Sequence, residues 1–291
     1  MNLSIKTIPL KPLFSILFGG CIFFSADAQK LPNIQSVSVR APANVKIDAR
    51  LNEWDDRFRA YNNNTDVFYT MANDDKNLYL VIKSADRMNN NKIMAGGINF
   101  TVNTAGKKNE KDAYTIVFPL IDMATYRSQM HTVTIEHPTG GGDNIRMAVG
   151  PGGGAPGQLD PAAIAEMRKQ AQSVVKEIKI VGFTADIADT VISVYNEYNI
   201  KAALDYDAKG NLVYEMAIPL KYFHLSVGNI REFAYNIKLN GPSPMRPPGA
   251  NMDGPPRGGG EIRADGGPPP GPMQALVSPT DFWGKYMLAK P

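Results

Sequence analysis

Several tyrosines in this chain stand beside amide and other polar side chains, a combination that suits sugar binding. A sugar lays its apolar C–H face on an exposed aromatic ring, while amides and carboxylates bind its hydroxyl groups. The same residues also occur as half-buried strand tyrosines and as plain polar turns, so both interpretations stay open. The candidate ligand-binding residues are Tyr61, Asn62, Asn63, Asn64, Tyr126, Arg127, Tyr195 and Tyr198.

Three carboxylates, Asp74, Asp75 and Asp86, are candidates for a calcium site. Calcium takes six to eight oxygen ligands, and carboxylates supply them. The chain has no Asp-x-Asp-x-Asp-Gly loop, and Asn73-Asp74-Asp75 is also typical of an ordinary turn. Calcium is the one cofactor that the sequence suggests.

No catalytic constellation is visible. Glycoside hydrolysis needs two carboxylates about 5 to 9 Å apart across a cleft, and Glu53, Glu197 and Glu215 are available. There is no Gly-x-Ser-x-Gly elbow, no zinc-type histidine pair and no phosphate loop. We therefore expect a protein that is not an enzyme, with a glycoside hydrolase as the least favoured alternative.

The first 28 residues have the pattern of a secretory signal. Lys6 and Lys11 precede an apolar run from Leu13 to Phe24, and Ala26-Asp27-Ala28 resembles a cleavage site. The run is too short to span a bilayer as a helix, which takes roughly 20 residues. We expect export to the periplasm, the outer-membrane surface or the medium. The alternative is a lipid anchor at Cys21, the only cysteine.

The formal charge of +3 argues against nucleic-acid binding, which needs clustered Lys and Arg on one face. We expect residues 29–291 to form a single domain, since β-sandwiches often exceed 200 residues as one unit.

Short alternating or β-branched stretches separated by turn residues are typical of an all-β, antiparallel β-sandwich of jelly-roll or immunoglobulin-like type. Strands are predicted near 45–48, 66–73, 77–85, 97–103, 113–118, 131–136, 178–183, 191–199, 212–218, 233–239 and 284–288.

One short helix is predicted after Asp160-Pro161, an N-cap followed by a first-turn proline. It lies in an insertion at about 139–172, and a second Gly/Pro-rich insertion covers about 241–275. Both insertions are expected to form loops because they contain few apolar side chains.

Four segments in order resemble the carbohydrate-binding module family 9-like domains. They are Ile47-Asp48-Ala49 leading to Glu53-Trp54, the Asp-rich turn at residues 73–77 leading through Leu78-Tyr79-Leu80 to Asp86, Tyr214-Glu215 running to Pro219-Leu220, and the closing Trp283-Gly284. The resemblance implies a sandwich in which Asp48, Glu53, Trp54, Glu215, Pro219 and Trp283 have structural roles. Ala49 replaces the family's glycine, which is compatible with a negative φ at that position.

The resemblance also implies a non-catalytic carbohydrate-binding protein of the cell envelope that contributes to polysaccharide binding or catabolism. The alternative is a structural subunit of a surface complex, in which the two Gly/Pro-rich loops contact an envelope protein partner. Long loops without secondary structure are often functional, which motivates this alternative.

Overall fold

A computed structural model describes residues 30–122, 124, 128, 131–135, 145–149, 160–229, 231–241 and 278–291. The chain divides into two units, Met1–Lys30 and Leu31–Pro291, and the second contains every element below. The expected signal segment, Cys21, Tyr126, Arg127 and most of both insertions lie outside the described residues.

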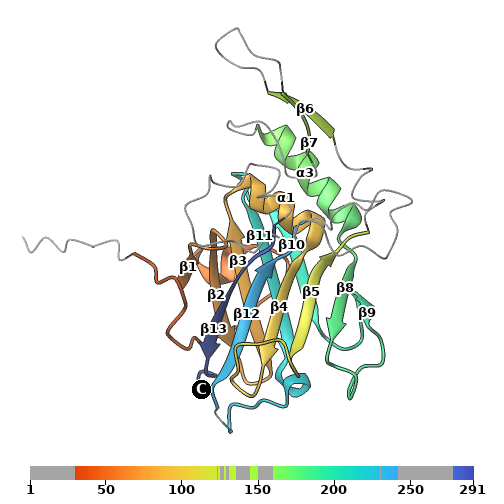
Figure 1. Ribbon diagram of the computed structural model, residues 1–291. Coiled ribbons are helices and arrows are strands. Elements are labelled where there is room, and N and C mark those ends of the chain that lie inside the picture. The colour runs from red at the N-terminus through yellow and green to blue at the C-terminus, as the bar shows by residue number, and fades with distance from the viewer. Residues whose placement is uncertain are drawn as a thin grey trace, which may run out of the picture. The chain divides into compact units, whose positions relative to one another are not determined.

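Two antiparallel sheets form a β-sandwich, which confirms the predicted fold class (Figure 1). The five-stranded sheet has the order β1 (Ala60–Asn62), β2 (Val67–Asn73), β3 (Asn77–Ser84), β11 (Leu212–Pro219) and β10 (Lys201–Tyr206). The six-stranded sheet has the order β13 (Thr280–Tyr286), β12 (Phe233–Leu239), β4 (Ile98–Asn103), β5 (Tyr114–Leu120), β8 (Glu177–Val181) and β9 (Val191–Ser193). A separate antiparallel pair consists of β6 (His131–Ile135) and β7 (Ile145–Val149).

The core lies between the two sheets and is rich in aromatic rings. Tyr69 on β2 and Tyr235 on β12 are fully buried, and their hydroxyls form a hydrogen bond of 2.9 Å. Phe118 on β5 packs on Tyr214 of β11, with ring centroids 5.5 Å apart. Because buried tyrosine hydroxyls need partners, the Tyr69–Tyr235 pair stabilises one arrangement of the two sheets.

Two α-helices and two short 3-10 helices accompany the described strands. The predicted inserted helix is α3 (Pro161–Val174), and the side chain of Asp160 caps it by accepting the N–H of Ala163. The 3-10 helices are η1 (Leu51–Trp54) and η2 (Leu220–Phe223). No helix in the described part of the chain is long and apolar enough to cross a membrane.

Helix α1 (Arg87–Gly96) is not predicted from the sequence. Its first five residues include three consecutive asparagines, which are poor formers of helix interiors. Asp86 nevertheless caps it by accepting the N–H of Asn89, and Gly97 ends it with φ 73°. The N-cap and C-terminal glycine were the sequence signals that could have revealed this helix.

Several strand predictions were wrong in detail. Residues 45–48 form no strand, and the predicted strand at 191–199 ends at Ser193 because a turn at residues 195–198 follows. The last strand starts at Thr280, four residues before its predicted start. Strands β1, β7 and β10 were not predicted.

Candidate functional site

Residues 40–58, here called the covering segment, pack against the outer face of the five-stranded sheet. Their apolar side chains, including Trp54 and Ile47, form a second hydrophobic cluster with Tyr79, Val81 and Ala217. Successive strand residues face opposite sides of a sheet. The covering segment therefore explains why β3 and β11 are buried on both faces.

Glu215 anchors the covering segment to β11. Its Oε2 accepts the backbone N–H groups of Asp48 at 3.0 Å and Ala49 at 2.7 Å, and its Oε1 accepts Nε1–H of Trp54 at 2.9 Å. The side chain is fully buried. Burial raises the pKa of Glu215 to about 7, although the three hydrogen bonds oppose that shift. These three contacts give Glu215 a structural role, because they join the covering segment to β11.

Asp48, Glu53 and Trp54 lie in the covering segment beside this anchor, whereas Pro219 lies four residues farther along β11. Asp48 Oδ1 accepts the N–H of Arg50, Glu53 lies in η1, and Pro219 ends β11. Trp54 is only 7% exposed and meets Tyr79 edge to face, with centroids 6.1 Å apart.

Trp283, for which the resemblance implies a structural role, is not a core residue. It is partly exposed on the outer side of β13 and belongs to neither hydrophobic cluster. Its neighbour Gly284 faces inward, where any side chain would collide with Tyr235. Strand alternation therefore places the indole of Trp283 on the opposite face.

The turn at Ala49 has φ 59°, which contradicts the negative φ expected for an alanine at this family glycine position. A left-handed conformation costs a residue with a Cβ about 1 kcal/mol or more. The hydrogen bond from the Ala49 N–H to Glu215 holds the residue in this conformation.

We expect Ala49→Gly to raise the free energy of unfolding by roughly 0.5 kcal/mol, because relief of strain exceeds the added entropy of the unfolded chain. Urea denaturation measures this change. The matched control is Ala203→Gly in β10, which should lower stability. If the two variants lost stability equally, the strain at Ala49 would be disproved.

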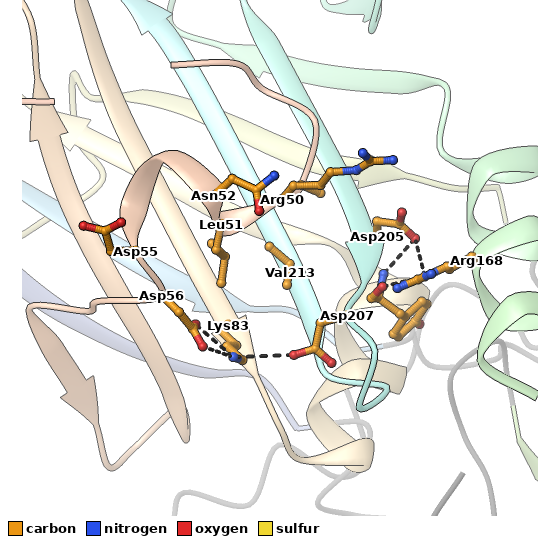
Figure 2. Close-up of a pocket in the computed structure, with 12 residues that line it drawn as sticks. Arg50, Leu51, Asn52, Asp55, Asp56, Lys83, Arg168, Asp205, Asp207 and Val213 are labelled. Carbon is orange, nitrogen blue, oxygen red and sulfur yellow. Dashed lines mark hydrogen bonds and ion pairs between the residues drawn. The ribbon is translucent and has the colours of Figure 1, made fainter. Parts of the chain in front are cut away.

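A cleft of about 530 Å³ opens beside η1 and is called the charged cleft (Figure 2). It is bounded by the covering segment, the ends of β3 and β11, strand β10 and helix α3. Leu51 and Val213 are apolar lining residues. Three cationic and four carboxylate side chains also line it: Arg50, Lys83, Arg168, Asp55, Asp56, Asp205 and Asp207.

Two ion-pair groups organise the charged cleft (Figure 2). Lys83 Nζ lies 2.9 Å from Asp56 Oδ1 and 3.4 Å from Asp207 Oδ2. Arg168 Nε donates to the carbonyl of Tyr206 at 2.7 Å and lies 3.8 Å from Asp205 Oδ1. Lys83 is held between two carboxylates and its side chain is only 16% exposed.

The carboxyl of Asp207 stays ionised in this setting. Burial alone would raise its pKa, but hydrogen bonds from the Asn211 side chain and from the N–H groups of Asn211 and Lys209, together with the charge of Lys83, lower the pKa overall. Asp207 is therefore a fixed hydrogen-bond acceptor.

One cation and one carboxylate at the edge of the cleft have no such partners among the described residues. The side chains of Arg50 and Asp55 form no ion pair or hydrogen bond with another described residue, and both are exposed. Figure 2 shows Arg50 and Asn52 projecting from the covering segment. These groups remain available to a ligand.

Three residues that line the charged cleft have left-handed backbone conformations. Eight non-glycine residues in the described part of the chain have positive φ, and Ala49, Asp55 (φ 53°) and Asp56 (φ 50°) line this cleft. Such conformations persist only where the surrounding structure imposes them, and they are enriched at binding sites. The strain supports this cleft as the candidate functional site.

The predicted sugar site at Tyr61 is largely a structural turn. Asn62 is fully buried, and its Oδ1 accepts both the N–H and the hydroxyl of Thr65. The hydroxyl of Tyr61 donates to Asp66, and its ring packs on Phe68 at 4.7 Å. Only Asn63 and Asn64 of the three amides are exposed.

Tyr195 and Tyr198 lie in the turn between β9 and β10. Tyr195 is 86% exposed, whereas the hydroxyl of Tyr198 donates to Asp189. Strands β1 and β10 are opposite edges of the five-stranded sheet. The structure therefore does not bring Tyr61 together with Tyr195.

The three candidate calcium ligands have other partners. Asp74 accepts the N–H groups of Lys76 and Asn77, Asp75 pairs with Arg40 at 2.9 Å, and Asp86 caps α1. Within the described ranges, no group of three or more His, Cys, Asp or Glu side chains has the spacing for a metal ion.

Comparisons of the chain with protein-family models, with curated proteins and with solved structures return no match.

Proposed function

We propose that this chain is a non-catalytic glycan-binding protein of the cell envelope, and that the charged cleft holds a neutral saccharide. The observation that carries the proposal is the near balance of three cations and four carboxylates around one cleft. Sugar hydroxyls both donate and accept hydrogen bonds, so they match alternating donors and acceptors. A charged ligand would pair with cleft side chains of one sign only and would leave those of the other sign without partners.

The rigidity of the cleft supports the same proposal. Lys83, Arg168 and Asp207 are fixed by the contacts described above, so a ligand would order few side chains on binding. Lower ordering entropy favours affinity. The apolar atoms of Leu51 and Val213 supply a surface for the C–H face of a sugar, although none of the described lining residues offers an exposed aromatic ring.

Export is part of the proposal because the first 28 residues carry the signal pattern and the resemblance is to modules that act on polysaccharides. N-terminal mass spectrometry of the exported protein should find Gln29 as its first residue. A retained Met1 would contradict the envelope location.

Arg50→Ala tests the cleft with little risk to the fold, since this exposed side chain forms no hydrogen bond or ion pair with another described residue. On an array of neutral oligosaccharides, affinity for any bound glycan should fall about tenfold, the effect of losing one hydrogen bond to a charged group.

The matched control is Arg57→Ala, an exposed arginine of the same covering segment that does not line the cleft. It should keep the affinity of the wild type. Equal affinity in both variants, or an array without any bound neutral glycan, would contradict the proposed function.

A further inference from the structure

A second cleft, of about 780 Å³, lies at the other end of the covering segment and has a different charge. On β11, Val213 lines the charged cleft, Ala217 lines the second cleft, and Glu215 lies between them on the same face. Four lysines line it: Lys46, Lys76, Lys201 and Lys221. We call it the lysine cleft.

The four lysines have no counter-charge among the described residues. None of them forms an ion pair there, and Lys221 makes only a cation–π contact, 4.7 Å from the ring centroid of Tyr222. Among the described residues that line it, Asp75 is the only carboxylate, and Arg40 pairs with it at 2.9 Å. Like charges around one concave surface repel each other and attract anions.

The backbone that carries these lysines is well fixed. The carbonyl of Lys76 accepts the N–H of Leu220 at 2.7 Å, which joins the β2–β3 turn to η2. Lys201 pairs with Ala217 in the β10–β11 ladder, and Lys46 lies two residues before the Asp48 N–H that Glu215 binds. The cations therefore come from four elements held in one arrangement.

The floor of the lysine cleft is apolar. Tyr79, Ala217, Leu220 and Leu225 line it and are each buried. Asn77 and Asn199 add amide groups at its edge. An apolar floor below a ring of cations suits a ligand that has both a C–H face and anionic substituents.

We propose that the lysine cleft binds an acidic saccharide, whose sulfate or carboxylate groups pair with the lysines while a ring lies on the apolar floor. The inference that the ligand is a saccharide rests on the proposed function. The inference that the ligand is anionic rests on the lysine cleft alone.

The test compares dextran sulfate oligosaccharides with unsulfated dextran of the same length, by calorimetry on the purified protein. The sulfated probe should bind more tightly. The variant Lys46→Ala/Lys76→Ala/Lys201→Ala should weaken its binding at least tenfold, since it removes three ion pairs of modest strength. Added salt should weaken the wild-type complex through screening.

The matched control is Lys107→Ala/Lys108→Ala/Lys111→Ala, which removes the same charge from exposed positions in the β4–β5 connection. It should keep affinity within about twofold, because these lysines are outside the lysine cleft. Equal losses in the two triple variants would show attraction by net charge and overturn the proposal. Equal binding of dextran and dextran sulfate would also overturn the proposal.

Inorganic sulfate separates a saccharide site from a free-anion site. The proposal predicts that sulfate at the same anion concentration displaces little of the oligosaccharide, and full displacement overturns the saccharide part. Arg50→Ala should leave dextran sulfate binding unchanged. Failure of the lysine cleft is thus distinguishable from failure of the charged cleft.

Discussion

Replacing Glu215 with alanine should lower the free energy of unfolding by about 3 kcal/mol or more at pH 8. The change leaves three N–H donors without their acceptor, those of Asp48, Ala49 and the Trp54 indole. A buried donor without a partner costs roughly 1 to 3 kcal/mol. Urea denaturation measures the loss. The control is Glu197→Ala, an exposed side chain whose removal should cost less than about 0.5 kcal/mol.

The free energy of unfolding of Glu215→Ala should fall below that of the wild type by more at pH 5 than at pH 8. Burial raises the pKa of Glu215 from 4.5 to about 7 in the folded protein. The folded state therefore holds the proton more tightly than the unfolded chain. The extra stability that comes from this tighter proton binding is complete below pH 4.5 and is lost as the pH rises through 7, whereas the contribution of the three hydrogen bonds remains at pH 8. A deficit that is equal at both pH values would show that the carboxyl titrates normally.

Trp54→Ala is expected to destabilise the domain by about 3 to 5 kcal/mol, the usual cost of truncating a large buried aromatic side chain. The mutation removes the contact with Tyr79, the hydrogen bond to Glu215 and the centre of the second hydrophobic cluster. Thermal and urea unfolding both measure the loss.

The comparison for this variant is Trp283→Ala, on the outer face of β13. Because Trp283 is partly exposed and outside both clusters, its loss should cost less than half as much. An equal or larger cost at Trp283 would contradict the assignment of Trp54 as the residue that holds the covering segment in place.

Local patterns were sufficient to predict much of the sandwich. The turn residues between β2 and β3 and the N-cap of α3 were visible in the sequence, and β12 was predicted with its observed bounds. The turn, the cap and this strand depend on neighbours in sequence or on alternation. The structural role expected for Glu215 came instead from the resemblance, and its hydrogen bonds to Asp48 and Ala49 join distant parts of the chain.

The charged cleft was not predicted because its residues are far apart in the sequence. Arg50, Lys83, Arg168 and Asp205 meet only because the topology places β10 beside β11 and because α3 contacts β10. Each of these charged residues, taken alone, is typical of a solvent-exposed surface position. The tyrosine and asparagine run at 61–64 had a conspicuous pattern, but Asn62 is buried and its Oδ1 binds the turn itself.

The most direct test of the account is hydrogen–deuterium exchange of the protein with and without a neutral oligosaccharide that binds on the array. If the charged cleft holds the ligand, residues 49–56 and 205–207 should gain protection, while residues 61–65 and 195–198 should not change. Protection at 61–65 or 195–198, with none at 49–56 and 205–207, would contradict the account.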